Sequence, residues 1–219
     1  MNRKIIFAVP TNDRIEPGTT LAIAGICRRE DIEYQAIMGS PTDLVRNSMV
    51  RRLLKDSEAT HLLMMDSDIL PPDNVVDLML ECDSPMSAAI VPIMLAGKIV
   101  SNIVENDRFM MHWEDRTEPF EVDGAGAGMI LIRREVFETI PWPWFRYEEE
   151  ESSGKRCGED LYFSNKASKY GFKYKVHPKS TCDHIKKIKL LDIVKMYNYI
   201  RNDVLAESQE KEKELVAHG

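Results

Sequence analysis

The sequence lacks paired cysteines, a long apolar run and a signal-peptide pattern. Its four cysteines lie far apart and form no C-x-x-C pair, so neither a disulfide framework nor a zinc site is expected. No apolar run approaches the roughly 20 residues of a membrane-spanning helix. The brief apolar segment 5–10 does not resemble a signal peptide. We therefore expect a reduced, cytoplasmic protein.

Acidic residues outnumber basic ones, 36 to 29. The formal net charge of -7 argues against a nucleic-acid polymer as the main partner, because phosphate backbones bind to basic surfaces. A nucleotide remains a possible ligand, since a metal ion can screen its phosphates. The 219 residues, 43% of them hydrophobic, suffice for one large α/β core without disulfides.

The first ninety residues alternate between apolar strand segments and helical patterns. Strands are expected at 4–10, 34–38, 61–65 and 86–90, with helices at 19–29, 40–55 and 71–81. In the second of these helices, Ser40 is the expected N-cap, Pro41 the first helical residue, and Leu44 one of the buried residues. This alternation predicts a parallel, doubly wound sheet that binds ligands beyond the carboxyl ends of its strands.

The second half of the chain has a different pattern. Segment 98–123 is typical of antiparallel strands or a long loop, and the glycine-rich segment 124–128 leads into a strand at 129–132. A helix is expected at 159–170, with Gly171 as its C-cap. We expect one domain over residues 1–185 and a charged helical tail over 186–219.

Asp66-Ser67-Asp68 directly follows the apolar segment 61–65. A D-x-D tripeptide arises about once by chance in such a chain, so its position after a strand gives it weight. Two adjacent carboxylates repel each other unless a proton or a cation lies between them. Their oxygens suit Mg²⁺ or Mn²⁺, which can bridge to substrate phosphates. The alternative is a solvated turn before a helix that begins with proline.

Two later segments could complete a site. His184 follows a strand and a proline-containing turn and could bind a metal together with Asp68, although a lone histidine is more often a surface residue. His177 is a competing candidate. Glu159 and Asp160 open a helix, where they either stabilise its first turn or include a general base.

Other polar and aromatic residues allow two interpretations each. Arg46 and Asn47 could reach a phosphate or ribose, or could lie on a solvated helix face. The glycines of segment 124–128 would let a ligand approach the backbone closely. Trp142 and Trp144 could stack on a sugar or fill the core, and the core is favoured for Trp142.

Taken in chain order, these residues resemble the GT-A glycosyltransferases, particularly the family 2-like branch. The matching segments are Val9-Pro10-Thr11, Val45-Arg46-Asn47, Leu62 to Asp68, Gly126 to Arg133, Pro143 to Phe145, Gly158-Glu159-Asp160 and Asp183-His184. The resemblance implies the α/β GT-A (nucleotide-diphospho-sugar transferase) fold, a doubly wound mixed sheet with helices on both faces.

The resemblance also implies roles for the matched residues. The residues implied for nucleotide-sugar binding are Pro10, Thr11, Asp13, Arg46, Asn47, Asp66 and Ser67. Those implied to bind Mn²⁺ or Mg²⁺ are Asp68, His184 and Asp66, and those implied for the acceptor side are Gly126, Ala127, Gly128 and Trp144. Asp160 is implied as the catalytic base, with Glu159 beside it. The usual aspartate after the second strand has no clean match, since only Ser40 or a displaced Asp43 is present. The nucleotide base therefore stays open.

The implied activity is metal-dependent transfer of a sugar, with inversion, from a UDP- or GDP-linked donor to an acceptor hydroxyl. The acceptor would be a glycan, a lipid or a small molecule. A nucleotidyltransferase and a non-catalytic sugar-nucleotide-binding module are alternatives. A haloacid-dehalogenase-type phosphatase fits less well, because Ile-Leu-Pro-Pro follows Asp68 where that family has Gly-Thr.

The tail places Lys186, Lys187 and Lys189 beside an apolar stripe. This pattern is compatible with a membrane surface. A homo-oligomer contact, or a helix packed on the domain, agrees better with the acidic segment 207–214 that follows.

Overall fold

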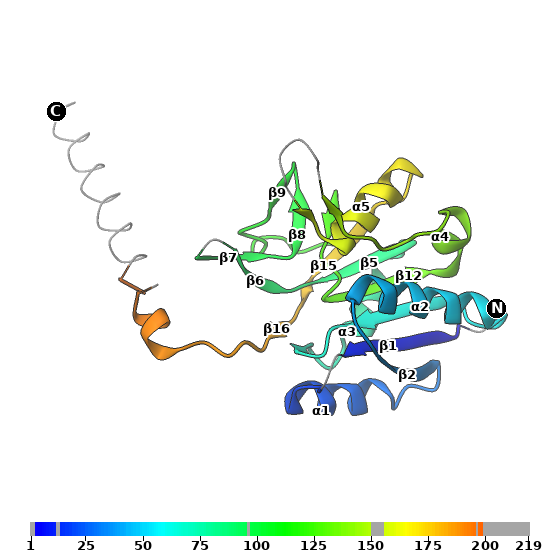
Figure 1. Cartoon of the computed structure of the whole chain (residues 1–219), viewed down its shortest axis with the longest axis horizontal. Coiled ribbons are helices and arrows are strands. Elements are labelled where there is room, and N and C mark those ends of the chain that lie inside the picture. The colour runs from blue at the N-terminus through cyan, green and yellow to red at the C-terminus, as the bar shows by residue number, and fades with distance from the viewer. Residues whose placement is uncertain (1–2, 12–13, 96, 150–155, 196, 199–219) are drawn as a thin grey trace. The chain divides into compact units, whose positions relative to one another are not determined.

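The computed structural model describes residues 3–11, 14–95, 97–149, 156–195 and 197–198 (Figure 1). The chain divides into two units, residues 1–185 and residues 186–219. The first unit contains the central sheet, and each unit is described by itself.

The central sheet has seven strands in the order β10-β15-β5-β12-β3-β1-β2. Their bounds are β1 Ile5–Thr11, β2 Ile32–Met38, β3 His61–Met65, β5 Met86–Ile90, β10 Phe120–Val122, β12 Met129–Arg133 and β15 Tyr174–Thr181. Strand β1 is parallel to β2 and β3, and β15 is parallel to β5. Strand β12 is antiparallel to both β3 and β5. The mixed sheet that the resemblance implies is confirmed, and the antiparallel β12 between β3 and β5 corrects the parallel sheet expected from the alternation of strands and helices.

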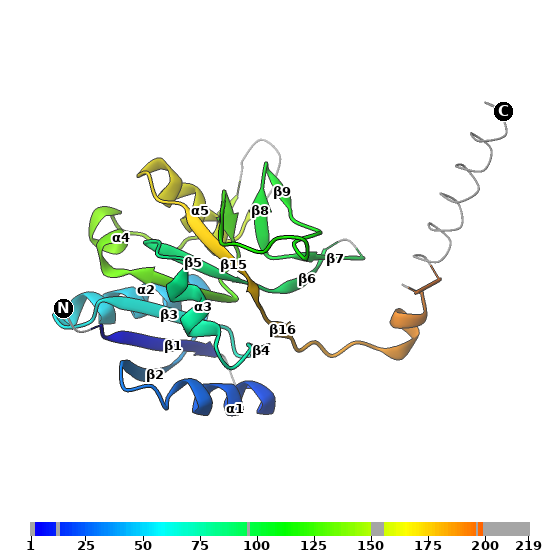
Figure 2. The same cartoon turned by 180° about the vertical axis from the view of Figure 1, so that it is seen from behind.

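Helices cover both faces of this sheet. They are α1 Pro17–Ile26, α2 Thr42–Lys55, α3 Val75–Glu81, α4 Arg134–Thr139 and α5 Glu159–Lys169. Successive side chains of a strand point to opposite faces, so β1 contributes Ile6 to one core and Phe7 to the other. Helices α2, α4 and α5 pack on the first core, and α1 and α3 on the second. Figures 1 and 2 show α1 and α2 on opposite sides of β1.

Short strands surround the carboxyl edge of the sheet. They are β4 Ile69–Leu70, β6 Pro92–Leu95, β7 Lys98–Ser101, β8 Ile103–Glu105, β9 Arg108–Phe109, β11 Gly124–Ala125, β13 Glu148–Glu149, β14 Arg156–Cys157 and β16 Asp183–His184. The pairs β6–β7 and β8–β9 confirm antiparallel strands between residues 98 and 123. Strand β16 pairs with β4 and places His184 opposite Ile69, next to the D-x-D segment.

Helix α2 differs from its expected form. It begins at Thr42, and Pro41 takes the N-cap position. Leu44 is exposed, whereas Val45 and Met49 are buried. The helix therefore turns Val45 and the neighbouring Arg46 toward the sheet, and this rotation determines the chemistry of the site.

In the second unit, residues 190–195 and 197–198 are helical. Among the residues that the structure describes, no helix is long and apolar enough to cross a membrane.

Candidate functional site

A buried arginine joins two of the predicted motifs. Arg46 on α2 is 2% exposed and donates from Nη2 to Asp66 Oδ1 at 2.7 Å and from Nε to Glu159 Oε1 at 3.1 Å. Burial alone would lower the pKa of this guanidinium, but the surrounding carboxylates outweigh burial and raise it. A buried cation between two carboxylates orients both.

This network corrects the prediction that Arg46 faces solvent or a phosphate. Asp66 and Glu159 neutralise the charge of Arg46, and the arginine in turn positions those two carboxylates. The Asp66 side chain is 35% exposed and also fixed through its backbone, whose N–H donates to Gly128 O at 2.8 Å. Partial burial raises the pKa of Asp66, and the charge of Arg46 opposes that rise. Asp66 thus presents one oxygen to Arg46, and its predicted donor and metal roles stay predictions.

Asp160 lies in the first turn of α5, facing the glycine-rich segment. Its Oδ2 accepts from Ala127 N at 3.3 Å, and its Oδ1 accepts from Leu161 N at 2.7 Å. Burial, followed by the charge of Glu159, raises the pKa of Asp160. A carboxylate with a raised pKa is a stronger base than free aspartate, as general-base chemistry requires.

Two glycines make room for Asp160. A methyl group on Gly158 would lie 2.7 Å from Asp160 Oδ1, and one on Gly126 would lie 3.2 Å from its Oδ2. Gly128 instead lies against Val91, where a methyl group would approach to 3.2 Å. Close packing around Asp160 therefore accounts for Gly126, and packing on Val91 accounts for Gly128.

Asp68 and His184 face each other beside the D-x-D turn. Asp68 Oδ2 lies 3.2 Å from His184 Nε2, and His184 Nδ1 lies 2.8 Å from the Pro92 carbonyl oxygen. A carbonyl oxygen only accepts, so Nδ1 carries a proton, and Nε2 faces the carboxylate oxygen of Asp68. These two atoms need a proton or a cation between them at this distance.

The pair fits a divalent cation that shares its shell with phosphates. Two ligands at right angles on bonds of about 2.1 Å lie about 3 Å apart, close to the observed 3.2 Å. Among the described residues, no group of three or more His, Cys, Asp or Glu side chains could hold a metal. Mg²⁺ sites with one or two protein carboxylates plus substrate phosphates are common, so Asp68 and His184 would need the donor to complete the shell.

The competing histidine lies elsewhere. His177 is buried within β15, and its Nε2 is 3.7 Å from Glu81 on α3. Its Nδ1 accepts from Lys179 N at 3.1 Å. His177 therefore belongs to the sheet and not to the D-x-D turn.

Asn47 and Trp144 have structural roles, which corrects two predictions. The Asn47 amide donates to Phe145 O at 2.6 Å and accepts from Trp144 N at 3.1 Å. Trp144 is buried, and its Nε1 donates to Ile140 O at 2.8 Å. Trp142, the expected core residue, is exposed, with the Arg51 guanidinium 6.0 Å from its ring centre. Asn47 therefore anchors the aromatic loop, and Trp144 offers no free ring face to an acceptor.

Asn102, which sequence reasoning missed, fixes the glycine-rich segment that was predicted for the acceptor side. Its Oδ1 accepts from Val91 N at 2.8 Å, and its Nδ2 donates to Gly126 O at 2.9 Å. It is buried and links β5, β8 and the glycine-rich segment. A single asparagine in a strand-like region gives no sequence signal of this role.

The end of β1 carries the remaining predicted residues. Pro10 is half-buried, and Thr11 is buried with its hydroxyl donating to Arg14 O at 2.9 Å. Ser67 is half-buried, and its carbonyl accepts from Glu16 N at 2.9 Å. Asp13 lies outside the described residues. The Thr11 hydroxyl therefore shapes the turn, and nucleotide contacts at this edge stay predictions.

Asp43 is a further candidate at the start of α2. Among the described residues, its buried Oδ1 has no hydrogen-bond partner. A buried acceptor without a partner is costly, and a ligand donor can satisfy it. Asp43 follows β2, where the family resemblance expects an aspartate.

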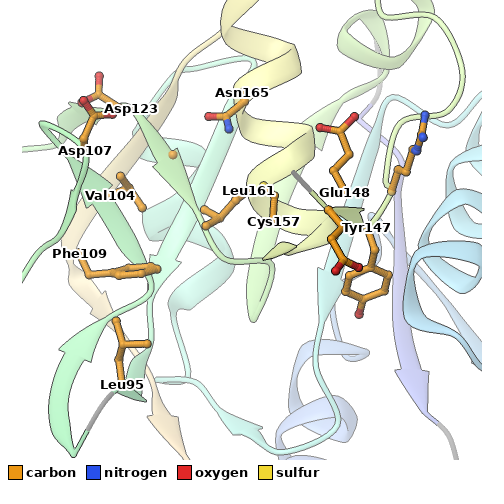
Figure 3. Close-up of a pocket in the computed structure, with 13 residues that line it drawn as sticks. Leu95, Val104, Asp107, Phe109, Asp123, Tyr147, Glu148, Cys157, Leu161 and Asn165 are labelled. Atoms are coloured by element: carbon orange, nitrogen blue, oxygen red, sulfur yellow. The ribbon is translucent and has the colours of Figure 1, made fainter. Parts of the chain in front are cut away.

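A cavity of about 1130 Å³ adjoins this cluster (Figure 3). Leu161 and Asn165 of α5 lie between its two ends, with Tyr147 toward one end and Leu95 toward the other. Tyr147 is hydrogen-bonded to Glu159; burial and then the charge of that carboxylate raise the tyrosine pKa. Leu161, which directly follows Asp160 in the chain, lines this cavity, whose volume has room for a sugar-sized molecule.

Known proteins match this chain in structure. No family model and no curated protein matches the sequence. A197 from STIV aligns with a TM-score of 0.55 at 20% identity, covering 85% of this chain and 98% of that one. GalNAc-T7 with UDP, GalNAc and Mn²⁺ aligns with a TM-score of 0.57 at 11% identity, covering 85% of this chain and 44% of that one. The fold is of the GT-A type.

These identities show the GT-A fold alone, and this chain spans less than half of the GalNAc-T7 chain. The chemistry must come from the residues themselves. They provide an Asp68–His184 pair suited to a divalent cation, a carboxylate fixed by Arg46, and a half-buried Asp160 that directly precedes the cavity residue Leu161.

Proposed function

We propose that this protein is a metal-dependent glycosyltransferase that moves a sugar from a nucleoside-diphosphate sugar to an acceptor hydroxyl. The observation that carries the proposal is the pairing of Asp68 Oδ2 with His184 Nε2 at 3.2 Å, at the carboxyl edge of a GT-A-type sheet. Ligands bind at this edge in doubly wound sheets. The two side chains would hold Mn²⁺ or Mg²⁺ against the donor diphosphate.

The bound cation would neutralise negative charge on the departing nucleoside diphosphate. Asp66, which Arg46 orients, accepts a hydrogen bond from a hydroxyl group of the donor's ribose or sugar. Asp160 takes the proton of the acceptor hydroxyl as that oxygen attacks the anomeric carbon. Glu159 is hydrogen-bonded to Arg46 and Tyr147, so we assign it the positioning of Asp160 and not the role of base.

We propose inversion as the stereochemical outcome. The proposed base, Asp160, lies in α5, whereas the proposed cation ligands Asp68 and His184 lie beside β4 and in β16. An acceptor hydroxyl entering from the cavity beside α5 would attack from the side opposite the diphosphate. Such in-line displacement inverts the anomeric centre. The configuration of the product, read by NMR, tests this point.

Asp43 is the proposed contact to the nucleotide base. Its partnerless Oδ1 suits an N–H donor such as the imide of uracil or the N1–H of guanine. Asp43→Ala should weaken binding of the correct nucleoside diphosphate by about tenfold, the loss of roughly one charge-assisted hydrogen bond. Equal binding by both proteins would remove Asp43 from the site.

Transfer and donor binding by wild-type protein and by Asp160→Asn test the central role. With Mn²⁺ and a panel of nucleotide sugars, wild-type protein should transfer or slowly hydrolyse one donor. Asp160→Asn should lose transfer by about 10²-fold or more, the contribution of a general base, while its donor affinity stays unchanged. Donor binding by wild-type protein without turnover of any donor would support a non-catalytic binding module instead. Release of pyrophosphate from a nucleoside triphosphate would indicate a nucleotidyltransferase.

A further inference from the structure

We propose that this protein binds the surface of an anionic membrane through two segments, each of which combines exposed apolar side chains with lysine. The first segment is the β6–β7 hairpin, and the second is the part of the tail from Lys186 to Tyr197. Each is described within its own unit of the chain.

The hairpin exposes apolar side chains on both of its faces. Met94 pairs with Ile99, and Leu95 pairs with Lys98. Neighbouring residues of a strand point to opposite faces, and Met94, Leu95 and Ile99 are all exposed, Ile99 by 55%. A two-stranded ribbon with apolar groups on both faces and a lysine near its turn is suited to insertion at a lipid interface.

The tail segment repeats this combination on a helix. Leu190, Ile193, Val194 and Tyr197 are exposed, Leu190 by 79%, and helical spacing places them within about a third of the circumference. Asp192, on the opposite side, lies 3.9 Å from Lys195. An exposed apolar stripe with flanking lysines is the pattern of a helix that lies in a membrane surface.

Charge favours an anionic bilayer over an uncharged one. Residues 186–198 contain four lysines and one aspartate, in a protein whose net charge is -7. The acidic segment 207–214 that follows would be repelled by anionic lipid, so the attraction that we propose is confined to residues 186–198. Lysine stems extend along apolar surface while their ammonium groups reach lipid phosphates. Because the rest of the chain is acidic, we expect the attraction to be local, modest and sensitive to salt.

The location of the hairpin relates this surface to the cavity. Leu95 lines the same cavity as Tyr147, the partner of Glu159 (Figure 3). A hairpin inserted at the interface would place one end of the cavity at the level of the lipid headgroups. This step rests on the proposed function: the acceptor would be a hydroxyl carried by a membrane lipid.

Vesicle flotation of the full chain tests the proposal without donor, metal or acceptor. Wild-type protein should float with vesicles of phosphatidylcholine and phosphatidylglycerol at low salt, and far less with phosphatidylcholine alone or at high salt. Ile99→Glu and Leu190→Glu should each lower the bound-to-free ratio by about tenfold, the loss of one inserted apolar side chain. Lys187→Gln and Lys189→Gln should each lower it about fivefold.

Leu21→Glu is the matched control, because Leu21 is 75% exposed on α1, outside both segments. It should float like wild-type protein, and circular dichroism should show all variants folded. Equal flotation with neutral vesicles, no flotation, or an equal loss in Leu21→Glu would overturn the proposal. A dimer that Leu190→Glu dissociates, with no flotation, would assign the tail to self-association instead. Asp160→Asn should float normally, so failure of flotation and failure of the proposed transferase activity remain distinguishable.

Discussion

Replacement of Arg46 by methionine tests whether this residue holds the site together. The substitution keeps much of the side-chain volume and removes the charge. It leaves Asp66 and the buried Glu159 facing each other without their cation. Removing one partner of a buried ion pair costs about 3–5 kcal/mol, because the remaining charge is uncompensated.

That cost should be visible in thermal unfolding. For a domain of 150–250 residues, each kcal/mol shifts Tm by about 2–4 °C, so Arg46→Met should lower Tm by about 6–20 °C. Arg52→Met is the matched control, since Arg52 is exposed on the same helix. Its loss should cost less than about 1 kcal/mol, the value of a helix-end charge.

A double-mutant cycle separates the ion pair from simple packing. If Glu159 is destabilised in Arg46→Met because its charge is uncompensated, then Glu159→Gln should recover part of the loss, and the double variant should be more stable than the two single effects predict. Additive effects, or a loss in Arg46→Met no larger than in Arg52→Met, would refute the view that Arg46 orients these carboxylates.

Three further predictions concern the surroundings of the site. Because burial raises the pKa of Asp160, the folded state binds more protons than the unfolded state between the ordinary and the raised pKa, and stability falls as pH rises through that window. Asp160→Asn removes this loss, so thermal melts should show a larger gain in Tm at pH 7 than at pH 4; an equal gain would contradict the assigned pKa direction. Gly158→Ala places a methyl group 2.7 Å from Asp160 Oδ1, and should lower kcat for transfer about tenfold or more by displacing the base, while circular dichroism stays unchanged; an unchanged kcat would show that Asp160 can shift freely. Trp144→Ala should cost about 3–5 kcal/mol in denaturant unfolding, as for a buried aromatic side chain, whereas Trp142→Ala should cost less than about 1 kcal/mol; similar costs would contradict the assignment of Trp144 to the core.

The central sheet was predictable because its strands carry continuous apolar runs. Residues 61–65 and 86–90 are strands with the predicted bounds, and the D-x-D segment does follow the first of them. The position of β12 was not predictable in the same way. Its five residues have the composition of a buried strand, but no local pattern specifies that it lies antiparallel between β3 and β5.

The chemistry of individual side chains depended on tertiary contacts that no local pattern reports. An arginine on a helix is exposed by default, and Arg46 is buried because carboxylates 20 and 113 residues away neutralise it. Trp142 and Trp144 stand two residues apart in one loop, and the Asn47 amide fixes the backbone of the second. The Asp68–His184 pairing was anticipated from the order of motifs, but the tautomer of His184 depends on the Pro92 carbonyl.

Calorimetric titration of UDP and of GDP, in the presence of Mn²⁺, tests the proposed donor site most directly. We predict that wild-type protein binds one of them at a single site, that EDTA abolishes this binding, and that Asp68→Asn weakens it by about tenfold or more, as loss of a metal ligand should. Asp83→Asn, an exposed aspartate with a φ of 40° that asparagine also adopts, is the matched control and should bind like wild-type protein. Equal affinity with and without Mn²⁺, or an Asp68→Asn protein that binds as well as Asp83→Asn, would contradict the assignment of this edge of the sheet to a metal-bound nucleotide.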